Sequence, residues 1–326
     1  MGILFIALMT IINLDPNWFI SVCSFRFMKM IFLLLVSVLT LVRAIPRSDC
    51  GNYTTKIPFS GTRSQIPRAG SQILGGVDAS LGHWPWMASV QRRAPSGDWE
   101  PHCGGSLIRD NWVLTAANCV PDGVTYRVVL GALDLAAPDG QEQAIATQQI
   151  IRHENFDPAS ENRANDVALI QLARNATIVR YRVDNICVPP AGLNYEDQVS
   201  CFVTGWGLTS NFTRPTILQE AHVDVISLAE CDEEIDITGP DLLDTQICTM
   251  DQLSDTRGAC SGDEGGPLQC RIDGQWDVVG IASWHGAEGP DCDPLSPTIY
   301  TRTQSFRQWI HDRVGEPAAD NGDNVE

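Results

Sequence analysis

The stretch Cys260-Ser261-Gly262-Asp263-Glu264-Gly265-Gly266-Pro267-Leu268 decides the fold of this chain. Around it, short apolar runs alternate with clusters of turn-forming residues, and runs rich in β-branched and aromatic residues predict strands. Many short strands with irregular loops between them favour a barrel or a sandwich. The predicted strands span residues 126–130, 167–172, 199–204, 223–226, 278–282 and 299–301.

One helix is predicted near the end of the chain, with Thr303 or Ser305 as its N-cap. Residues 315–326 are acidic and rich in Pro, Gly and Asn, which predicts a disordered tail. The helix is indicated by four apolar residues at helical spacing, Phe306, Trp309, Ile310 and Val314.

The 326 residues carry a formal net charge of -18. This acidic balance argues against nucleic acid, heparin-like polymers and anionic membranes as the main partners.

A secretory signal is predicted at Met28-Lys29-Met30, followed by the apolar residues 31–42 and a cleavage site after Ala44. A competing apolar run, residues 3–14, lacks a basic start, and both runs are too short to span a bilayer. Residues 1–44 are then an upstream extension followed by the signal, and translation from Met28 would remove the extension. We therefore expect a secreted, extracellular protein.

The chain has 11 Cys, of which Cys23 precedes the signal and ten follow it. An even number after a signal predicts disulfides formed in an oxidising compartment. Three weak N-glycosylation motifs begin at Asn52, Asn175 and Asn211.

Nine segments stand out between residues 73 and 314. They are Ile73-Leu74-Gly75-Gly76, Trp84-Pro85-Trp86-Met87, Cys103-Gly104-Gly105-Ser106-Leu107-Ile108, Trp112-Val113-Leu114-Thr115-Ala116-Ala117, Asn165-Asp166-Val167-Ala168-Leu169-Ile170, Gly205-Trp206-Gly207, the stretch 260–268, Gly280-Ile281-Ala282-Ser283-Trp284 and Tyr300-Thr301-Arg302. Through these segments, and in the same order, residues 73–314 resemble the trypsin and chymotrypsin family of serine proteases. The resemblance implies an all-β fold of two six-stranded antiparallel barrels with the active cleft between them, here followed by the predicted helix.

The resemblance also implies the disulfide pairing. Residues 45–72 become a propeptide or linker that a bridge between Cys50 and Cys187 ties to the protease-like domain. The other implied pairs are Cys103–Cys119, Cys201–Cys270, Cys231–Cys248 and Cys260–Cys292.

Two members of the family's catalytic triad are replaced. Asn118 in Thr115-Ala116-Ala117-Asn118-Cys119 stands where the family has its histidine base, and Glu264 stands where it has the serine nucleophile; Asp166 remains. An amide has no titratable proton near neutral pH, and Glu264 has no hydroxyl. Its charge is also expected beside the oxyanion-hole-like backbone N–H groups of Gly262 and Glu264.

The specificity-pocket-like positions are Gly258, Ser283, His285 and Thr298. Gly258 gives no preference for Arg or Lys, and the side chains of His285 and Thr298 are expected to narrow the pocket.

The activation site is changed as well. Gln72 precedes Ile73 where the family has a basic residue, while Asp263, which in the family receives the new N-terminal ammonium group, is kept. Either a protease of another specificity cuts there or the chain is never matured; we favour the second.

No metal or cofactor is predicted. The six His residues show no metal-ligand spacing. In the family's calcium loop, residues 131–143, Asp139 and Glu142 are available as ligands, but Ala132 replaces an expected carboxylate.

The sequence thus predicts a non-catalytic serine protease homologue, a monomer that binds an extracellular partner: a protease, an inhibitor or a surface component. One alternative is a hydrolase of altered chemistry that uses Glu264 and Asp166. Another is an active serine endopeptidase hidden by a sequence error. We further expect the Asn118 amide to donate hydrogen bonds to Glu264 and Asp166 together, and the Gly262 N–H to reach Glu264.

Overall fold

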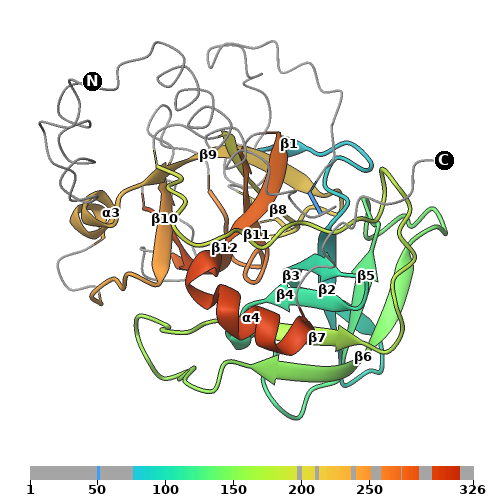
Figure 1. The fold of residues 1–326 in the computed structure, drawn as a ribbon. Helices are drawn as coiled ribbons and strands as arrows, with labels where there is room; N and C mark the ends of the chain where they lie inside the picture. The colour runs from blue at the N-terminus through green and yellow to red at the C-terminus, as the bar shows by residue number, and fades with distance from the viewer. Residues whose placement is uncertain are drawn as a thin grey trace, which may run out of the picture. The chain divides into compact units, whose positions relative to one another are not determined.

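Six antiparallel strands close into a first barrel in the computed structural model (Figure 1). The structure describes residues 50–51, 76–196, 200–209, 213–235, 240–250, 258–272, 274–285 and 296–315, all within the unit Ser48–Ala318. Around the barrel the strands follow the order β2-β3-β4-β7-β6-β5. Their bounds are β2 (Met87–Arg93), β3 (Trp99–Arg109), β4 (Trp112–Thr115), β5 (Tyr126–Leu130), β6 (Gln143–Arg152) and β7 (Ala168–Leu172).

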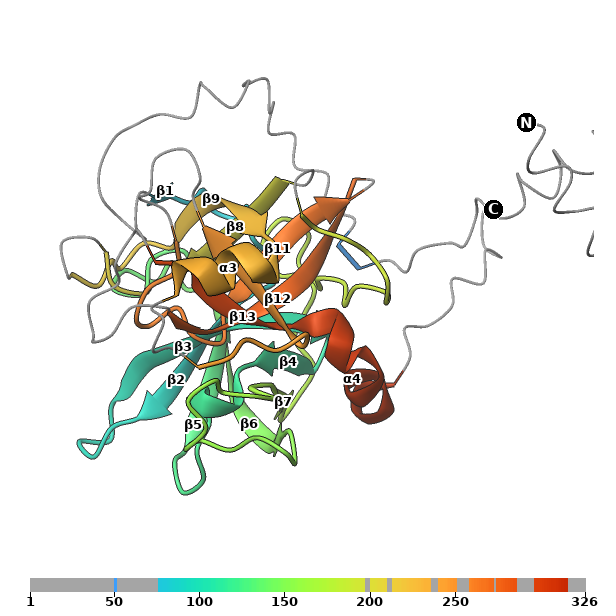
Figure 2. The same ribbon diagram turned by 90° about the vertical axis from the view of Figure 1, so that its left-hand side faces the viewer.

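A second barrel is built from the later strands. The order β9-β10-β13-β12-β11-β8 is closed by pairing of β8 with β9, and the short β1 (Val77–Asp78) adds to β9. All six predicted strands are confirmed, and so is the two-barrel fold, which Figure 2 shows from another side. The bounds are β8 (Ser200–Gly205), β9 (Gln219–Ile226), β10 (Gln246–Met250), β11 (Pro267–Ile272), β12 (Gln275–His285) and β13 (Thr298–Arg302).

The predicted C-terminal helix is confirmed as α4 (Arg307–Val314), which follows the 3-10 turn η4 (Thr303–Phe306). Its predicted N-cap is wrong, because the 3-10 turn moves the cap to Phe306, whose side chain makes no capping bond. The helix packs on the first barrel: Trp309 and Ile310 join that core, and the Trp309 indole donates to Glu154 at 2.8 Å.

A second helix, α3 (Leu228–Glu234), was not predicted. It begins at a capping box, in which the Ser227 hydroxyl accepts from the Glu230 N–H and the Glu230 carboxylate accepts from the Ser227 N–H. The Ser-x-x-Glu spacing was available in the sequence as a signal for this helix.

Four of the implied disulfides are confirmed: Cys50–Cys187, Cys103–Cys119, Cys201–Cys270 and Cys231–Cys248. Cys260 is also disulfide-bonded, while Cys292 lies outside the described residues. The same is true of the signal, of Ile73, of Asn52 and Asn211, and of the tail. In the described ranges, no helix is long and apolar enough to cross a membrane.

Candidate functional site

Loops next to the barrel strands carry the triad-equivalent residues. Asn118 lies in the 3-10 turn η3 (Ala117–Cys119) after β4, where the Cys103–Cys119 disulfide ties it to β3. Asp166 lies just before β7 in the same barrel, and Glu264 lies in the turn before β11 of the second barrel. The structure therefore brings Asn118 and Asp166 from separate loops into direct contact, as the triad assignment requires.

The Asp166 carboxylate is the fully buried centre of the site. One oxygen accepts from the Asn118 backbone N–H at 2.8 Å, and the other accepts from the Asn118 side-chain amide and the Ser283 hydroxyl, both at 2.6 Å. Burial raises the pKa of Asp166, while the bonds from Ser283 and Asn118 lower it. Ser283, expected only as a pocket residue, is thus a direct partner of Asp166.

The Glu264 carboxylate lies against the backbone of its own turn. Its Oε2 accepts from the Gly262 N–H at 2.6 Å, as expected, and the Glu264 carbonyl accepts from the Gly104 N–H at 2.8 Å. The expected bridge through Asn118 is wrong: the Asn118 amide donates to Asp166 and, at 3.4 Å, to the Ser283 carbonyl, and to no Glu264 atom within the described residues. The Gly262 N–H, two residues away in the chain, donates to Glu264 in place of the Asn118 amide.

Glycine is needed to form this turn. Gly262 has φ +103° and Gly265 has φ +76°, and a Cβ at Gly265 would lie 2.7 Å from the Gly104 carbonyl oxygen. A side chain at Gly265 would therefore separate the two barrels at this point of contact. The turn can hold Glu264 against Gly262 because its backbone adopts conformations that other residues rarely reach.

Asp263, the activation-like residue, is buried under the same turn. Its carboxylate accepts from the backbone N–H groups of Gly207 at 2.7 Å and Cys260 at 2.9 Å. Burial raises the pKa of Asp263 to about 7, the two backbone donors oppose the shift, and Glu264 adds to it.

Arg163 belongs to the site, and the sequence reasoning missed it. Its guanidinium donates to the Ser283 carbonyl at 2.7 Å. The β12–β13 register shifts between Ala282 and Trp284, which leaves Ser283 out of the strand pairing. Arg163 has φ +47°, uncommon for a residue other than glycine. No motif marks such a loop arginine in a sequence.

The remaining pocket-like residues, Gly258, His285 and Thr298, lie close together. His285 and Thr298 are paired across β12 and β13, and a Cβ at Gly258 would lie 3.2 Å from the Thr298 hydroxyl. Burial lowers the pKa of His285, while the charge of Glu264 opposes that shift. Thr298 is buried, and its hydroxyl lies against Gly258.

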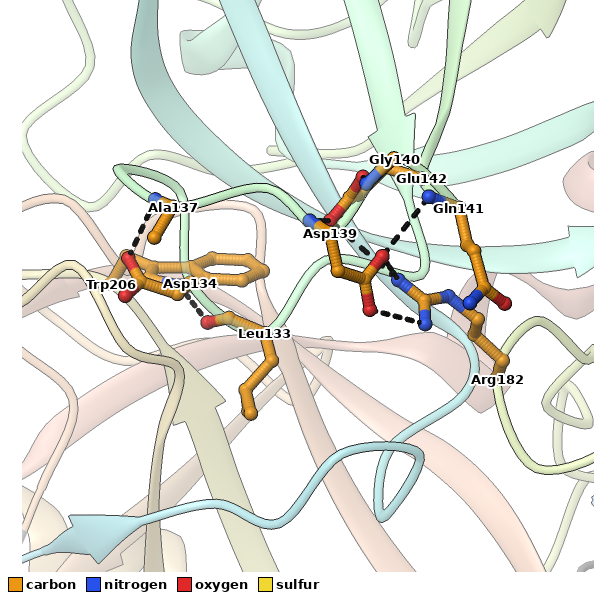
Figure 3. Close-up of polar contacts among 9 residues, drawn as sticks. All are labelled: Leu133, Asp134, Ala137, Asp139, Gly140, Gln141, Glu142, Arg182 and Trp206. Atoms are coloured by element: carbon orange, nitrogen blue, oxygen red, sulfur yellow. Dashed lines mark hydrogen bonds and ion pairs between the residues drawn. The ribbon is translucent and has the colours of Figure 1, made fainter.

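The calcium-loop segment holds an arginine instead of a metal-ligand set (Figure 3). The Arg182 guanidinium donates to both carboxylate oxygens of Asp139, at 2.8 and 2.6 Å, and lies 3.5 Å from Glu142. The Glu142 carboxylate also accepts from the Asp139 and Gly140 N–H groups, each at 2.9 Å. Because a guanidinium and backbone donors use these oxygens, the residues present do not fit calcium.

A family model described as Trypsin matches residues 73–310. Among the relatives, the chymotrypsin-like elastase family member 1 of Bos taurus is 32% identical over 263 residues, which cover 80% of this chain and 97% of the relative. The protein of the same name from Canis lupus familiaris is 32% identical over 257 residues, covering 78% and 97%. That from Rattus norvegicus is 31% identical over 263 residues, covering 80% and 97%. Together with the two barrels and the disulfides, these similarities show that the chain belongs to the trypsin family of chymotrypsin-type serine proteases.

Proposed function

We propose that this protein is a secreted, non-catalytic member of its family that acts by binding an extracellular partner. The partner is a protease, a protease inhibitor or a surface component, and the protein acts as a cofactor, decoy or recognition factor. Its signal and residues 45–72 would serve export and the tethering of the N-terminal segment, as expected for a secreted relative of a zymogen.

The proposal is supported first by the chemistry of Asn118 and Glu264. Peptide hydrolysis in this family needs a hydroxyl nucleophile and an imidazole that takes and returns its proton. Asn118 stands in the sequence where the family has that histidine, and its side-chain amide donates to Asp166. An amide orients well in that position but cannot transfer a proton near neutral pH.

The single observation that carries the proposal is the 2.6 Å bond from the Gly262 N–H to the Glu264 carboxylate. In an acyl transfer, a backbone donor at this position stabilises the negative oxygen that develops in the transition state. Here a carboxylate oxygen of the protein already uses that donor. An oxyanion at the same place would first have to displace the Glu264 side chain.

A hydrolase of altered chemistry is less well supported. It would need Asp166 as a second working carboxylate beside Glu264. Asp166 is fully buried and accepts three hydrogen bonds, from two donors of Asn118 and from Ser283. Such a group is suited to holding other residues in place rather than to activating water.

The test is covalent labelling and turnover of the purified secreted chain, cut artificially before Ile73. The relatives are named elastases, so elastin joins the peptides of the substrate panel. We expect no labelling by a fluorophosphonate probe and a rate about 10⁶-fold below that of an intact triad. The matched positive control is Asn118→His with Glu264→Ser in one chain. Labelling of the unaltered protein, or turnover that follows it through purification, would refute the proposal.

A further inference from the structure

The β2–β3 hairpin presents two arginines and a tryptophan on one side of the first barrel. Figure 2 shows this hairpin projecting at the lower left. Arg93 ends β2 and Trp99 begins β3, and the two residues are directly paired. Arg127 comes from β5, on the other side of β2, where it is paired with Gln91.

The two guanidinium groups converge on one indole ring. The Arg127 Cζ atom lies 4.8 Å from the Trp99 ring centroid, and the Arg93 Cζ atom lies 5.9 Å from it. Each side chain is held by its Nε: that of Arg127 donates to Gln91 Oε1 at 2.8 Å, and that of Arg93 donates to the Gly97 carbonyl at 3.3 Å. Among the described residues, no acceptor is bonded to the terminal nitrogens of either guanidinium group, so these nitrogens can donate to a bound acceptor.

No carboxylate of the described residues forms a salt bridge with Arg93 or Arg127. Side chains alternate between the two faces of a strand. The neighbouring Arg92 forms its ion pair with Glu100, at 3.6 Å, one position along each strand from Arg93 and Trp99. The Asp98 carboxylate accepts from the Ser96 hydroxyl within the turn. Within the described residues, the two positive charges therefore lie close together without an ion pair to a carboxylate, an arrangement that a bound anion would relieve.

The hairpin is also ordered in advance of binding. The Ala94 N–H donates to the Asp98 carbonyl and the Gly97 N–H donates to the Ala94 carbonyl, both at 2.8 Å. Fixed positions reduce the entropy lost when a partner binds. Arginine and tryptophan are among the residue types that most often dominate the energy of protein interfaces.

We propose that Arg93, Trp99 and Arg127 form a binding site for a short acidic segment of a partner protein. The guanidinium groups can each donate two hydrogen bonds to an Asp or Glu carboxylate in bidentate geometry, and the indole offers an apolar surface beside them. A protein segment is favoured over a sulfated polysaccharide because the chain carries a net charge of -18. A long polyanion would extend past these residues and meet that charge, whereas a short segment contacts only the site.

This inference deepens the proposed function by naming the chemistry of the partner, and the two can fail separately. Labelling of the unaltered protein by a fluorophosphonate would overturn the proposed function and leave this binding site in place. Conversely, loss of the binding described below would leave the catalytic argument untouched.

The test is the fluorescence anisotropy of a fluorescein-labelled oligoglutamate peptide titrated with the full secreted chain. We expect saturable binding that weakens as salt is raised, and a loss of about tenfold in affinity in Arg127→Gln and in Arg93→Gln. Arg271→Gln is the matched control, because the Arg271 Nε also donates to a turn glycine carbonyl, that of Gly274, at 3.3 Å. Its affinity should match that of the unaltered chain.

A second measurement does not depend on substitutions. An oligoglutamate peptide carrying a photo-crosslinker should attach within residues 91–100 or beside Arg127. Attachment elsewhere, equal affinity in all three variants, or absence of binding at low salt would overturn the proposal. Tighter binding of a sulfated oligosaccharide of matched charge, competing at the same residues, would overturn the assignment to a protein segment.

Discussion

Replacing Asp263 by asparagine should remove a defined part of the pH dependence of unfolding. The Asp263 carboxylate is 2% exposed and has backbone donors but no side-chain cation bonded to it in the described structure. Its pKa rises from 3.8 to about 7, chiefly because burial penalises the charged form. The asparagine side chain in the variant cannot ionise, so a difference between the two proteins isolates this group.

The expected change in the free energy of unfolding follows from the shift in the pKa of Asp263. Between pH 4 and 7 the folded protein keeps a proton on Asp263 that the unfolded chain has lost, so the free energy of unfolding falls as the pH rises. The stabilisation is present below the unfolded pKa and is gone once the pH has passed the folded pKa. A shift from 3.8 to about 7 corresponds to about 4 kcal/mol, at about 1.4 kcal/mol for each pH unit.

The assay is urea unfolding of the uncut chain and of Asp263→Asn at a series of pH values from 4 to 8. We expect the unfolding free energy of the unaltered protein, minus that of the variant, to fall by about 4 kcal/mol across the series. Glu233→Gln, an exposed residue of α3, controls for the loss of one carboxylate. A difference that stays constant with pH would refute the reasoning. In a chain cut before Ile73, pairing of the new ammonium group with Asp263 would remove the slope, so the same titration reports on maturation.

Three further outcomes are expected. Asn118→Ala removes a 2.6 Å donor from the buried Asp166 carboxylate and should lower the unfolding free energy by ~1.5–3 kcal/mol; an unchanged denaturation midpoint would show that the bond is unimportant. Glu264→Ser alone and Asn118→His alone should remain inactive, whereas the double variant should label with a fluorophosphonate; strong activity of either single variant would contradict the residue assignment. Arg182→Gln should speed hydrogen exchange at the Asp139 and Gly140 amides, which the arginine-anchored loop protects; unchanged exchange would show that the loop is ordered without it.

The fold could be predicted because its determinants are local. Six of the strands carry apolar runs and turn signals that the sequence shows locally. The two barrels and the four described disulfides were implied by the family resemblance, whose cysteine positions this chain matches. The N-cap of α4 was missed because the 3-10 turn before it depends on how Phe306 packs into the core. The residue at which this helix begins therefore depends on tertiary packing, which the local sequence pattern does not show.

The sequence pointed to Asn118, Asp166 and Glu264 and to the bond from the Gly262 N–H to Glu264, but it missed Arg163 and the hydrogen bond from Ser283 to Asp166. The contact between Asn118 and Asp166 follows from the family positions. Side-chain direction does not: Glu264 turned to the nearest N–H, that of Gly262, rather than to the Asn118 amide. Arg163 reaches the Ser283 carbonyl through a left-handed backbone conformation, which is set by the surrounding loop and not by the residue type.

Arg182 has a consequence for where this protein can work. A loop ordered by a dissolved ion follows mass action, and its stability falls as the free concentration of that ion drops below the dissociation constant. The guanidinium that holds Asp139 is covalently part of the chain, so its local concentration is fixed and survives dilution. The part of this loop's order that Arg182 provides therefore does not depend on the calcium concentration of the surrounding fluid.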